Sequence, residues 1–491
     1  MNRQIIKLFA FIMALFAVLV GFTAWWSVFN AKELKASKYN HRPLYEQQQI
    51  PRGRILADDG SVIAKSIPQG KGANRTYVRH YPMGSLFGHP IGYSFIEVAQ
   101  SEFEKFHNEE LTGEESEFGT ILDELTGQKQ EGEQIVTSLD PKAQEVAMHA
   151  LEAAGFGAVV AIEPSTGAVK VMASNPGYNP NKVPDTKYYE RLNSKAEEAT
   201  RPLVNRAAQG LYPPGSTFKV VTAAAGLESG VITPESTINA PGSIIDEGHE
   251  LANDGHIDWG PIPLDTALTN SVNTWFGQLG QKIGQGKLFT TMEKFGFNAK
   301  PPIDIPEEEL LASGVWDLEA DKLLTRNDPV DLARLAIGQE RLLVTPLQDA
   351  MVAAAVANKG KLMKPQIWNR VVNVDGSVTK RMQPSVYSEP IKPKTAEELT
   401  TAMEGVVSEG TGTNAAISGV RVAGKTGTAE TPSNQACGGG SEENQGWFMG
   451  FAPADHPKIA IAATVECTTQ FGNDVAAPIF REVAETLLAG E

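Results

Sequence analysis

The longest apolar stretch of the chain lies at its N-terminus, over residues 8–29. A helix needs about 20 apolar residues to cross about 30 Å of hydrocarbon, so this stretch is long enough to span a membrane. Two basic residues, Arg3 and Lys7, precede it, and two tryptophans lie near its far end. Because basic flanks stay in the cytoplasm, we predict a cytoplasmic tail over residues 1–7, a single transmembrane signal-anchor helix over residues 8–29, and an extracytoplasmic remainder.

A cleaved signal peptide is the competing interpretation of this N-terminal pattern. The apolar core of a signal peptide is usually about 7–15 residues long, and a small-x-small cleavage site follows it. The run in this chain is longer, and no such site follows it. We therefore expect an uncleaved anchor in the cell membrane.

Beyond the anchor, the pattern divides the chain into a small domain and a large one. Over residues 30–134, short strand-like pieces alternate with turns and then enter an acidic stretch. The pattern changes near residue 135, where a strand signal leads into a helix start at Asp140 and Pro141. We expect residues 135–491 to form the second domain.

The second domain is predicted to open with strands, continue with helices and close with strands. Two β-branched runs over 157–162 and 168–173 flank a turn-rich segment, which predicts a hairpin. The other expected elements are helices over 143–154, 216–227, 264–279, 346–358 and 476–488, strands over 420–428, 446–451 and 458–465, and an extended loop over 174–214. This order predicts an α+β domain whose sheet joins both ends of its sequence.

Composition and charge narrow the classes of protein that remain. The 491 residues are 41% hydrophobic and 21% charged, as in ordinary globular proteins, which excludes a disordered chain and a multi-span membrane protein. The net charge of -16 provides no basic patch, so nucleic acid is not an expected partner. Residues 101–134 hold eleven acids against two lysines, and we interpret this segment as a solvated surface.

The cysteines and histidines indicate neither a metal site nor a cofactor. The only cysteines, Cys437 and Cys467, show no zinc-ligand spacing with the eight histidines, and the chain has no His-Glu-x-x-His motif. In an oxidising compartment two cysteines can pair, but their spacing alone does not establish a disulfide.

The first candidate for catalytic chemistry is the pair Ser216-x-x-Lys219. At positions i and i+3 on a helix, the hydroxyl and the amine lie on one face within hydrogen-bonding reach. A lysine with a lowered pKa can activate a serine nucleophile. A helix N-terminus also directs unpaired backbone N–H groups towards a developing oxyanion.

The pair Ser377-x-x-Lys380 has the same spacing and serves as a control. Asp375-Gly376 precedes it between two strand-like runs, which predicts a hairpin turn. The two side chains would then lie on opposite faces of a strand, so we discard this pair.

Two further motifs each occur once in the chain. Ser271-Val272-Asn273 places a hydroxyl that can relay a proton near an amide that can hold a substrate peptide, although the motif taken alone is better explained as the polar start of a helix. Lys425-Thr426-Gly427-Thr428 continues a strand pattern to which an extended peptide can add, with Lys425 and the threonine hydroxyls facing its carboxylate. A strand that ends in a glycine bulge is the alternative.

No Gly-x-Ser-x-Gly motif occurs and no histidine adjoins these motifs, so a Ser-His-Asp hydrolase fits poorly.

The three motifs, in this order, resemble the active-site motifs of the penicillin-binding proteins. The likeness covers nearly all of residues 135–491 and includes the segments 205–207, 212–216, 337–339, 345–348, 357–360 and 447–453. The N-terminal domain resembles the pedestal, or dimerisation-like, domain of the class B, monofunctional members, through the motifs that begin at Arg52 and Arg79. Ala57 replaces the acid usual in the first motif, which weakens the expectation of salt bridges between the domains. The compact pedestal and the C-terminal helix are most similar to those of actinobacterial members.

The resemblance implies a penicillin-binding/β-lactamase-like transpeptidase fold, with an antiparallel sheet flanked by helices, and the cross-linking of peptidoglycan. Ser216 would attack the penultimate D-Ala carbonyl of a stem peptide, release D-Ala and pass the acyl group to an amine of a second peptide. β-Lactams would be trapped at the same serine. Lys219 would be the base, and Ser271 with Lys425 would carry the proton to the leaving amine. The implied substrate-binding residues are Asn273, Thr426, Gly427 and Thr428, with the N–H groups of Ser216 and Thr428 as the oxyanion hole.

The resemblance also implies a partner and leaves alternatives open. A membrane glycosyltransferase of the shape or division family is the implied partner, because no glycosyltransferase domain fits in this chain. A D,D-carboxypeptidase, a penicillin-hydrolysing enzyme, a β-lactam sensor and a scaffold without catalytic activity share parts of the pattern, but the pedestal and the intact motifs favour the transpeptidase. A disulfide between Cys437 and Cys467 near the active-site rim is a hypothesis, since adjacent antiparallel strands can bring them together.

Overall fold

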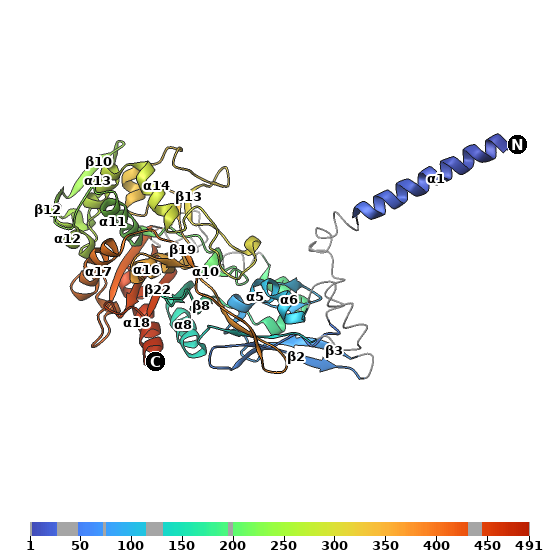
Figure 1. Cartoon of the computed structure of the whole chain (residues 1–491). Coiled ribbons are helices and arrows are strands. Elements are labelled where there is room, and N and C mark those ends of the chain that lie inside the picture. Colours follow the sequence, from blue (N-terminus) through green and yellow to red (C-terminus); the bar gives the residue numbers. More distant parts are fainter. Residues whose placement is uncertain are drawn as a thin grey trace.

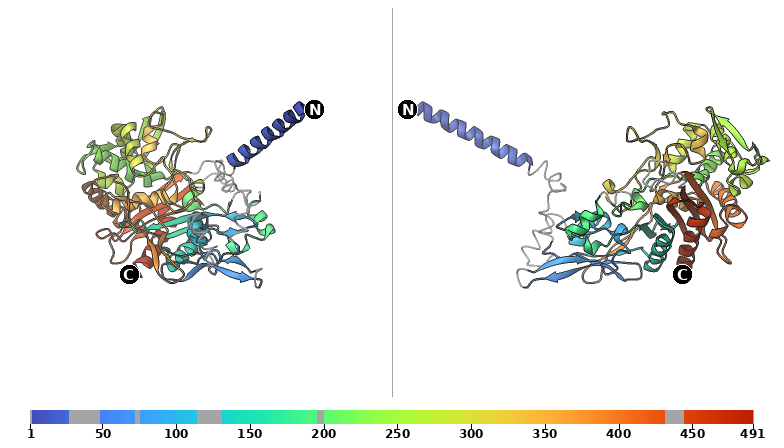
Figure 2. Two further views of the ribbon diagram at one scale, coloured as in Figure 1. Left: turned by 45° about the vertical axis from the view of Figure 1, so that its right-hand side comes forward. Right: turned by 180° about the vertical axis from the view of Figure 1, so that it is seen from behind.

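Helix α1 (Asn2–Ala24) lies apart from the rest of the protein (Figures 1 and 2). The computed structural model describes residues 2–26, 48–71, 75–113, 131–194, 200–430 and 444–490. The segment Arg3–Ala24 contains a window with a mean hydropathy of 2.6, and none of that window is buried. Among the described residues, this one helix is long and apolar enough to cross a membrane, as predicted. The end of the predicted span, residues 27–29, lies outside the described residues.

A mixed sheet has six strands in the order β18-β17-β6-β1-β2-β3. Figure 1 labels two of them, β2 and β3. Its strands are β1 (Ile55–Leu56), β2 (Val62–Gln69), β3 (Thr76–His80), β6 (Gln134–Thr137), β17 (Trp368–Val372) and β18 (Val378–Arg381). β1 and β6 are parallel, and the other neighbours are antiparallel. The sheet takes strands from both sides of the boundary predicted at residues 134 and 135, and that boundary stays a prediction.

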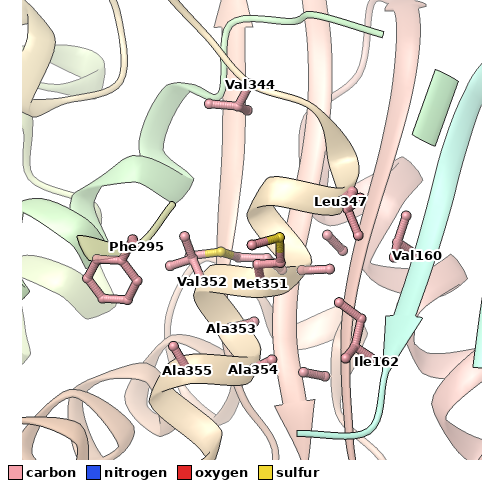
Figure 3. Packing of buried hydrophobic residues seen from close by; sticks show 14 of the residues in the cluster. Val160, Ile162, Phe295, Val344, Leu347, Met351, Val352, Ala353, Ala354 and Ala355 are labelled. Carbon is pink, nitrogen blue, oxygen red and sulfur yellow. The ribbon is translucent and has the colours of Figure 1, made fainter. Parts of the chain in front are cut away.

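A five-stranded antiparallel sheet, in the order β20-β21-β22-β7-β8, forms the centre of the larger part. Its strands are β7 (Gly157–Ile162), β8 (Val169–Asn175), β20 (Ala423–Glu430), β21 (Asn444–Ala452) and β22 (Ile459–Thr468). Side chains of β7 alternate between two buried clusters, because successive residues of a strand point to opposite faces. Val160 packs on the face covered by α16 (Pro346–Ala357), and Val159 packs on the face covered by α18 (Gly472–Ala489). Figure 3 shows Leu347 of α16 beside Val160.

Helices flank both faces of the central sheet. Besides α16 and α18, the longer helices of the chain after α1 are α8 (Pro141–Ala154), α11 (Lys219–Glu228), α13 (Asn273–Ile283), α14 (Gln285–Lys294) and α17 (Pro393–Ser408). The shorter helices are α4 (Gly88–Ile91), α5 (Glu102–Phe106), α6 (Asn108–Thr112), α9 (Thr186–Leu192), α10 (Arg206–Gln209), α12 (Leu264–Thr269), α15 (Leu332–Ala336) and the 3-10 helices η3 (Pro180–Lys182), η5 (Gly215–Phe218), η6 (Asp254–His256), η7 (Glu307–Glu309) and η8 (Thr413–Ala415). The remaining strands are β4 (Ser94–Phe95), β5 (Ala99–Gln100), β9 (Ile238–Ala240), β10 (Ser243–Asp246), β11 (His249–Ala252), β12 (Gly260–Ile262), β13 (Gly314–Asp317), β14 (Lys322–Leu323), β15 (Leu342–Leu343), β16 (Leu362–Met363) and β19 (Val386–Ser388).

The predicted α+β fold is confirmed, and so is the sheet that joins both ends of the second domain. Asp140 caps α8 as expected, by accepting a hydrogen bond from Ala143 N at 2.8 Å. The single helix predicted over residues 264–279 is wrong, because it is interrupted after α12 and resumes as α13. The cause is Ser271, whose φ of 56° is incompatible with a continuous right-handed helix. The predicted loop over 174–214 also contains the short helices η3, α9 and α10.

The predicted solvated surface of the acidic segment is wrong for two of its members. Glu102 and Glu104 are buried. Glu104 tolerates burial because it accepts hydrogen bonds from Arg52 Nε at 2.7 Å and from Arg79 Nε at 2.6 Å. Residues 114–130, which hold several of the other acids, lie outside the described residues.

Ion pairs join the two predicted domains in spite of Ala57. Lys170 Nζ of β8 lies 3.1 Å from Asp58 Oδ2, directly after the buried Ala57. Lys105 Nζ of α5 lies 2.6 Å from Glu308 Oε1. The acid that the first pedestal motif lacks is therefore not needed for charged contacts across this junction.

The predicted disulfide is not tested by the described residues. Cys467 lies near the end of β22 and has a φ of 54°. Cys437 lies outside the described residues, so its pairing with Cys467 stays a prediction.

Candidate active site

Ser216 lies in η5, which leads directly into α11. Ser216 is half-buried, whereas the residues on either side of it, from 212 to 215 and from 217 to 226, are buried. In a 3-10 helix residues i and i+3 lie on one side, so the backbone directs Ser216 and Lys219 the same way. Trp447 Nε1 donates a hydrogen bond to Pro213 O at 3.0 Å, which holds the segment before the serine against β21. The turn thus presents the Ser216 hydroxyl among residues that are buried and held in place.

Two glycines allow η5 to pack directly on the outer strand β20. A Cβ on Gly215 would lie 2.6 Å from Thr428 O, and a Cβ on Gly427 would lie 2.5 Å from Pro214 O. Side chains at either position would therefore push the turn and the strand apart. The close packing brings Ser216 next to the Lys-Thr-Gly-Thr segment, where Thr428 is half-buried.

Lys219 is fully buried, and its amine is surrounded by oxygen atoms. Nζ donates to Asn273 Oδ1 at 2.6 Å and to Ser271 O at 2.7 Å, and it lies 3.1 Å from Ser271 Oγ. Burial, reinforced by the charge of Lys425, lowers the pKa of Lys219 well below its ordinary value. A neutral amine has two N–H groups and one lone pair. With both N–H groups donated to the two carbonyl oxygens, the lone pair stays available to accept a proton from a hydroxyl.

Ser271 connects Lys219 with the second lysine of the site. Lys425 Nζ donates to Ser271 Oγ at 3.0 Å and to Thr426 O at 3.0 Å. Lys425 is also fully buried, and burial lowers its pKa to about 7. Burial lowers the pKa of both lysines, and the repulsion between two neighbouring ammonium groups favours the state in which only one of them is charged. The Ser271 hydroxyl therefore lies between a cation and a neutral amine, and it can pass a proton between them.

The predicted substrate-binding residues have partners within the protein. Asn273 uses both ends of its amide: Oδ1 accepts from Lys219, and Nδ2 donates to Ala252 O at 2.9 Å. Thr426 Oγ1 lies 2.7 Å from Thr411 Oγ1. Asn273 thus orients Lys219, and its contact with substrate stays a prediction. Thr411 was not predicted, because it lies in a segment after α17 that no motif marks.

Asp349 is a second residue that the motifs do not indicate. It lies on α16 and is buried near Thr217, the neighbour of the serine. Burial raises the pKa of Asp349 to about 7. The signal in the sequence was an acid within the mostly apolar run of 346–357. In the described ranges, no group of three or more His, Cys, Asp or Glu that could hold a metal ion is found around Asp349 or elsewhere.

The discarded pair shows the hairpin geometry that the sequence predicted. Ser377 Oγ donates to Asp375 Oδ1 at 2.6 Å in the turn between β17 and β18. Lys380 Nζ instead lies 3.0 Å from Glu110 Oε1. Both Ser377 and Lys380 are exposed, and no second lysine or relay hydroxyl pairs with them among the described contacts.

Comparisons with known proteins agree with this geometry. Residues 157–485 match the penicillin binding protein transpeptidase domain, and residues 52–135 match the penicillin binding protein A dimerisation domain. The chain is 32% identical over 502 residues to the peptidoglycan D,D-transpeptidase PbpA of Mycolicibacterium smegmatis, with 98% of each chain covered. It is 31% identical over 518 residues to PbpA of Mycobacterium tuberculosis, with 100% of each chain covered.

Solved structures give the same result. Penicillin-binding protein A from M. tuberculosis, as its ceftriaxone acyl-enzyme complex, is similar with a TM-score of 0.79 and 30% identity, covering 90% of this chain and 99% of that chain. The D,D-transpeptidase domain of a peptidoglycan glycosyltransferase from Eggerthella lenta is similar with a TM-score of 0.76 and 32% identity, again covering 90% and 99%. The resemblance inferred from the motifs is confirmed, including the closer likeness to the actinobacterial proteins. This chain belongs to the penicillin-binding protein transpeptidase family.

Proposed function

We propose that this protein is a peptidoglycan D,D-transpeptidase that cross-links stem peptides through an acyl-enzyme on Ser216. The observation that carries the proposal is the row of hydrogen bonds from Lys219 through Ser271 to Lys425, placed beside a half-exposed serine. A nucleophile, a neutral base and a cation for the substrate carboxylate are the groups that serine acyl transfer requires. Relatives named D,D-transpeptidase and an acyl-enzyme structure of a similar protein support the same reaction.

Acylation begins with proton transfer from Ser216 to Lys219. Ser216 Oγ attacks the carbonyl carbon of the penultimate D-Ala, while its proton moves to the lone pair of the Lys219 amine. The negative charge on the tetrahedral intermediate is stabilised by the backbone N–H groups of Ser216 and Thr428. When the C–N bond breaks, the leaving D-Ala amine takes a proton through Ser271, and the acyl group stays on Ser216 as an ester.

The second half of the reaction reverses the proton path with a different amine. An amine of a neighbouring stem peptide attacks the ester, gives its proton to Lys219 and releases Ser216 Oγ, which regains a proton. The net change is the exchange of one amide bond for another, so no cofactor is required. β-Lactams follow the first half and remain on Ser216.

Strand β20 is the proposed binding edge for the donor peptide. It is the outer strand of the described five-stranded sheet, so its free edge can accept an extended peptide as an additional strand. Lys425, Thr426 and Thr428 lie along this strand, and we assign to them the terminal carboxylate of the donor. Asn273 is assigned to the peptide group that precedes the scissile bond.

The choice of acceptor separates a transpeptidase from the other activities of this fold. The full-length protein is incubated with a D-Ala-D-Ala donor peptide and increasing concentrations of an acceptor amine, and the products are measured by mass spectrometry. We expect the new amide to become the main product and D-Ala to be released in equal amount. A hydrolysed donor that dominates at saturating amine would identify a carboxypeptidase, and no release of D-Ala would identify a sensor or a scaffold.

We also propose that α1 holds the protein in the cell membrane, with the catalytic domain outside and a membrane glycosyltransferase as partner. The apolar Arg3–Ala24 segment supports the anchor. After alkaline carbonate extraction, the full-length chain is expected to stay with the membranes, whereas a chain that starts at residue 27 is expected to be soluble. Release of the full-length chain by carbonate would contradict the anchor.

A further inference from the structure

A cavity of about 110 Å³ lies in the pedestal domain, beside strands β2 and β3 and remote in sequence from the catalytic residues. Its lining includes Arg52, Arg79, Ser66 and Ser94, and Pro184 of the second domain also borders it. A space of this size accommodates a carboxylate group or a few water molecules. We refer to it as the pedestal cavity.

The buried charges beside the pedestal cavity do not balance. Arg52 and Arg79 are 9% and 5% exposed, and both keep a positive charge near neutral pH. They share Glu104, which is 0% exposed and pairs with both guanidiniums. Burial and the neighbouring Arg79, opposed by Glu104, lower the pKa of Arg52, as expected for a cation that is only partly compensated. The cluster therefore holds two buried positive charges and one buried negative charge.

Arg79 also has a donor that the described residues leave unused. Its Nε donates to Glu104, and its Nη1 donates to Gly53 O at 2.6 Å. In the part of the chain that the structure describes, no group accepts a hydrogen bond from the buried Nη2. A buried donor on a charged group without an acceptor is strongly unfavourable. One anion beside Nη2 would correct both the missing acceptor and the charge imbalance.

Ser66 places a hydroxyl on the same side of the sheet as Arg79. The two residues are directly opposite one another in the ladder of β2 and β3, so their side chains lie on one face. Ser66 Oγ donates to Arg52 O at 2.9 Å, next to the cluster. Ser66 therefore keeps its only proton on the chain, whereas Arg79, which lines the cavity and carries the unused Nη2, has the guanidinium that suits the planar group of a carboxylate.

We propose that the pedestal cavity binds a carboxylate, which accepts hydrogen bonds from Arg79 Nη2 and compensates the excess positive charge. The carboxylate belongs either to a small free anion or to an acidic side chain of an extracytoplasmic peptide. Because Pro184 borders the same cavity, the bound group would contact both domains of the chain.

The test measures thermal unfolding of the full-length protein at constant ionic strength, with chloride replaced by acetate. We expect the midpoint to rise by about 2 °C or more as the cavity fills, because a ligand that binds only the folded state stabilises it. Acetyl-glutamate amide, with acetyl-glutamine amide as its uncharged control, separates a free anion from a peptide side chain. If acetyl-glutamate amide raises the midpoint at a much lower concentration than acetate does, the natural ligand is an acidic side chain of a peptide. No rise with either carboxylate would overturn the proposal.

The variant Ser66→Asp places a carboxylate of the chain itself opposite Arg79. We expect it to keep or raise the midpoint and to lose the response to acetate, whereas the exposed control Ser377→Asp keeps that response. A lower midpoint in Ser66→Asp with an unchanged acetate response would show that the cavity does not accept a carboxylate. Glu97 is exposed on the rim of the cavity. If acetate raises the unfolding midpoint of Glu97→Gln but not that of the wild type, the Glu97 carboxylate already occupies the cavity, and the proposal is overturned.

Discussion

Replacing Ser216 by alanine is expected to abolish covalent labelling by penicillin, with the acylation rate falling by at least about 10⁴-fold. The reason is that Ser216 is the half-exposed hydroxyl on the turn that also carries the buried Lys219. Mass spectrometry of the intact protein, followed by peptide mapping, should find one adduct on the wild-type chain, in the peptide that contains Ser216. The variant should remain unmodified and unfold at nearly the same temperature, because only one oxygen atom at a half-buried position is lost.

Ser377→Ala is the matched control for this substitution. Ser377 has the same spacing to a lysine, but its hydroxyl is bonded to Asp375 and Lys380 pairs with Glu110. The Ser377→Ala chain is expected to be acylated at the wild-type rate. Labelling that survives Ser216→Ala, or labelling that is lost in Ser377→Ala, would refute the assignment of the nucleophile.

The sequence predicted those features that depend on local spacing and on hydrophobic period. Ser216 and Lys219 are one helical turn apart, so their common direction follows from helix geometry. Inner strands of the central sheet were also predictable, because the runs 157–162 and 458–465, which form β7 and β22, are rich in β-branched and small apolar residues. The discarded Ser377 pair shows that the same reasoning can reject a motif, since the turn before it fixed the strand geometry.

Features that depend on tertiary contacts could not be predicted. The interruption between α12 and α13 depends on the positive φ of Ser271, which an isolated Ser-x-Asn motif does not reveal. The hydrogen bonds that hold the Asn273 amide between Lys219 and Ala252 O join distant segments, so the motif alone could not predict them. The burial of Glu104 depends on Arg52 and Arg79, which precede it by 52 and 25 residues. Charge runs in a sequence carry no information on such long-range pairing.

Replacing Lys219 by arginine is expected to lower the acylation rate by about 10²–10⁴-fold, the usual contribution of a general base. Arginine is a cation of similar length that keeps its proton at all accessible pH values, so it cannot accept the proton of Ser216. The variant should therefore stay slow at every pH. Circular dichroism and the unfolding midpoint should be recorded with the rate, because the larger group enters a fully buried position. A rate that recovers at high pH, or remains at the wild-type value, would exclude Lys219 as the base.

The variant Lys425→Arg tests the second lysine through the pH dependence of the acylation rate. We expect Lys219 to set the rising limb of that dependence and Lys425 to set the falling limb. In the wild type, acylation should rise with pH as Lys219, whose pKa burial and Lys425 lower, becomes neutral and able to accept a proton. Acylation should fall again above about pH 7, where burial causes Lys425 to lose the charge that binds the carboxylate of the β-lactam. In Lys425→Arg the guanidinium keeps its charge, so the rising limb should remain and the falling limb should disappear. A falling limb that persists in this variant belongs to another group and would contradict the role assigned to Lys425.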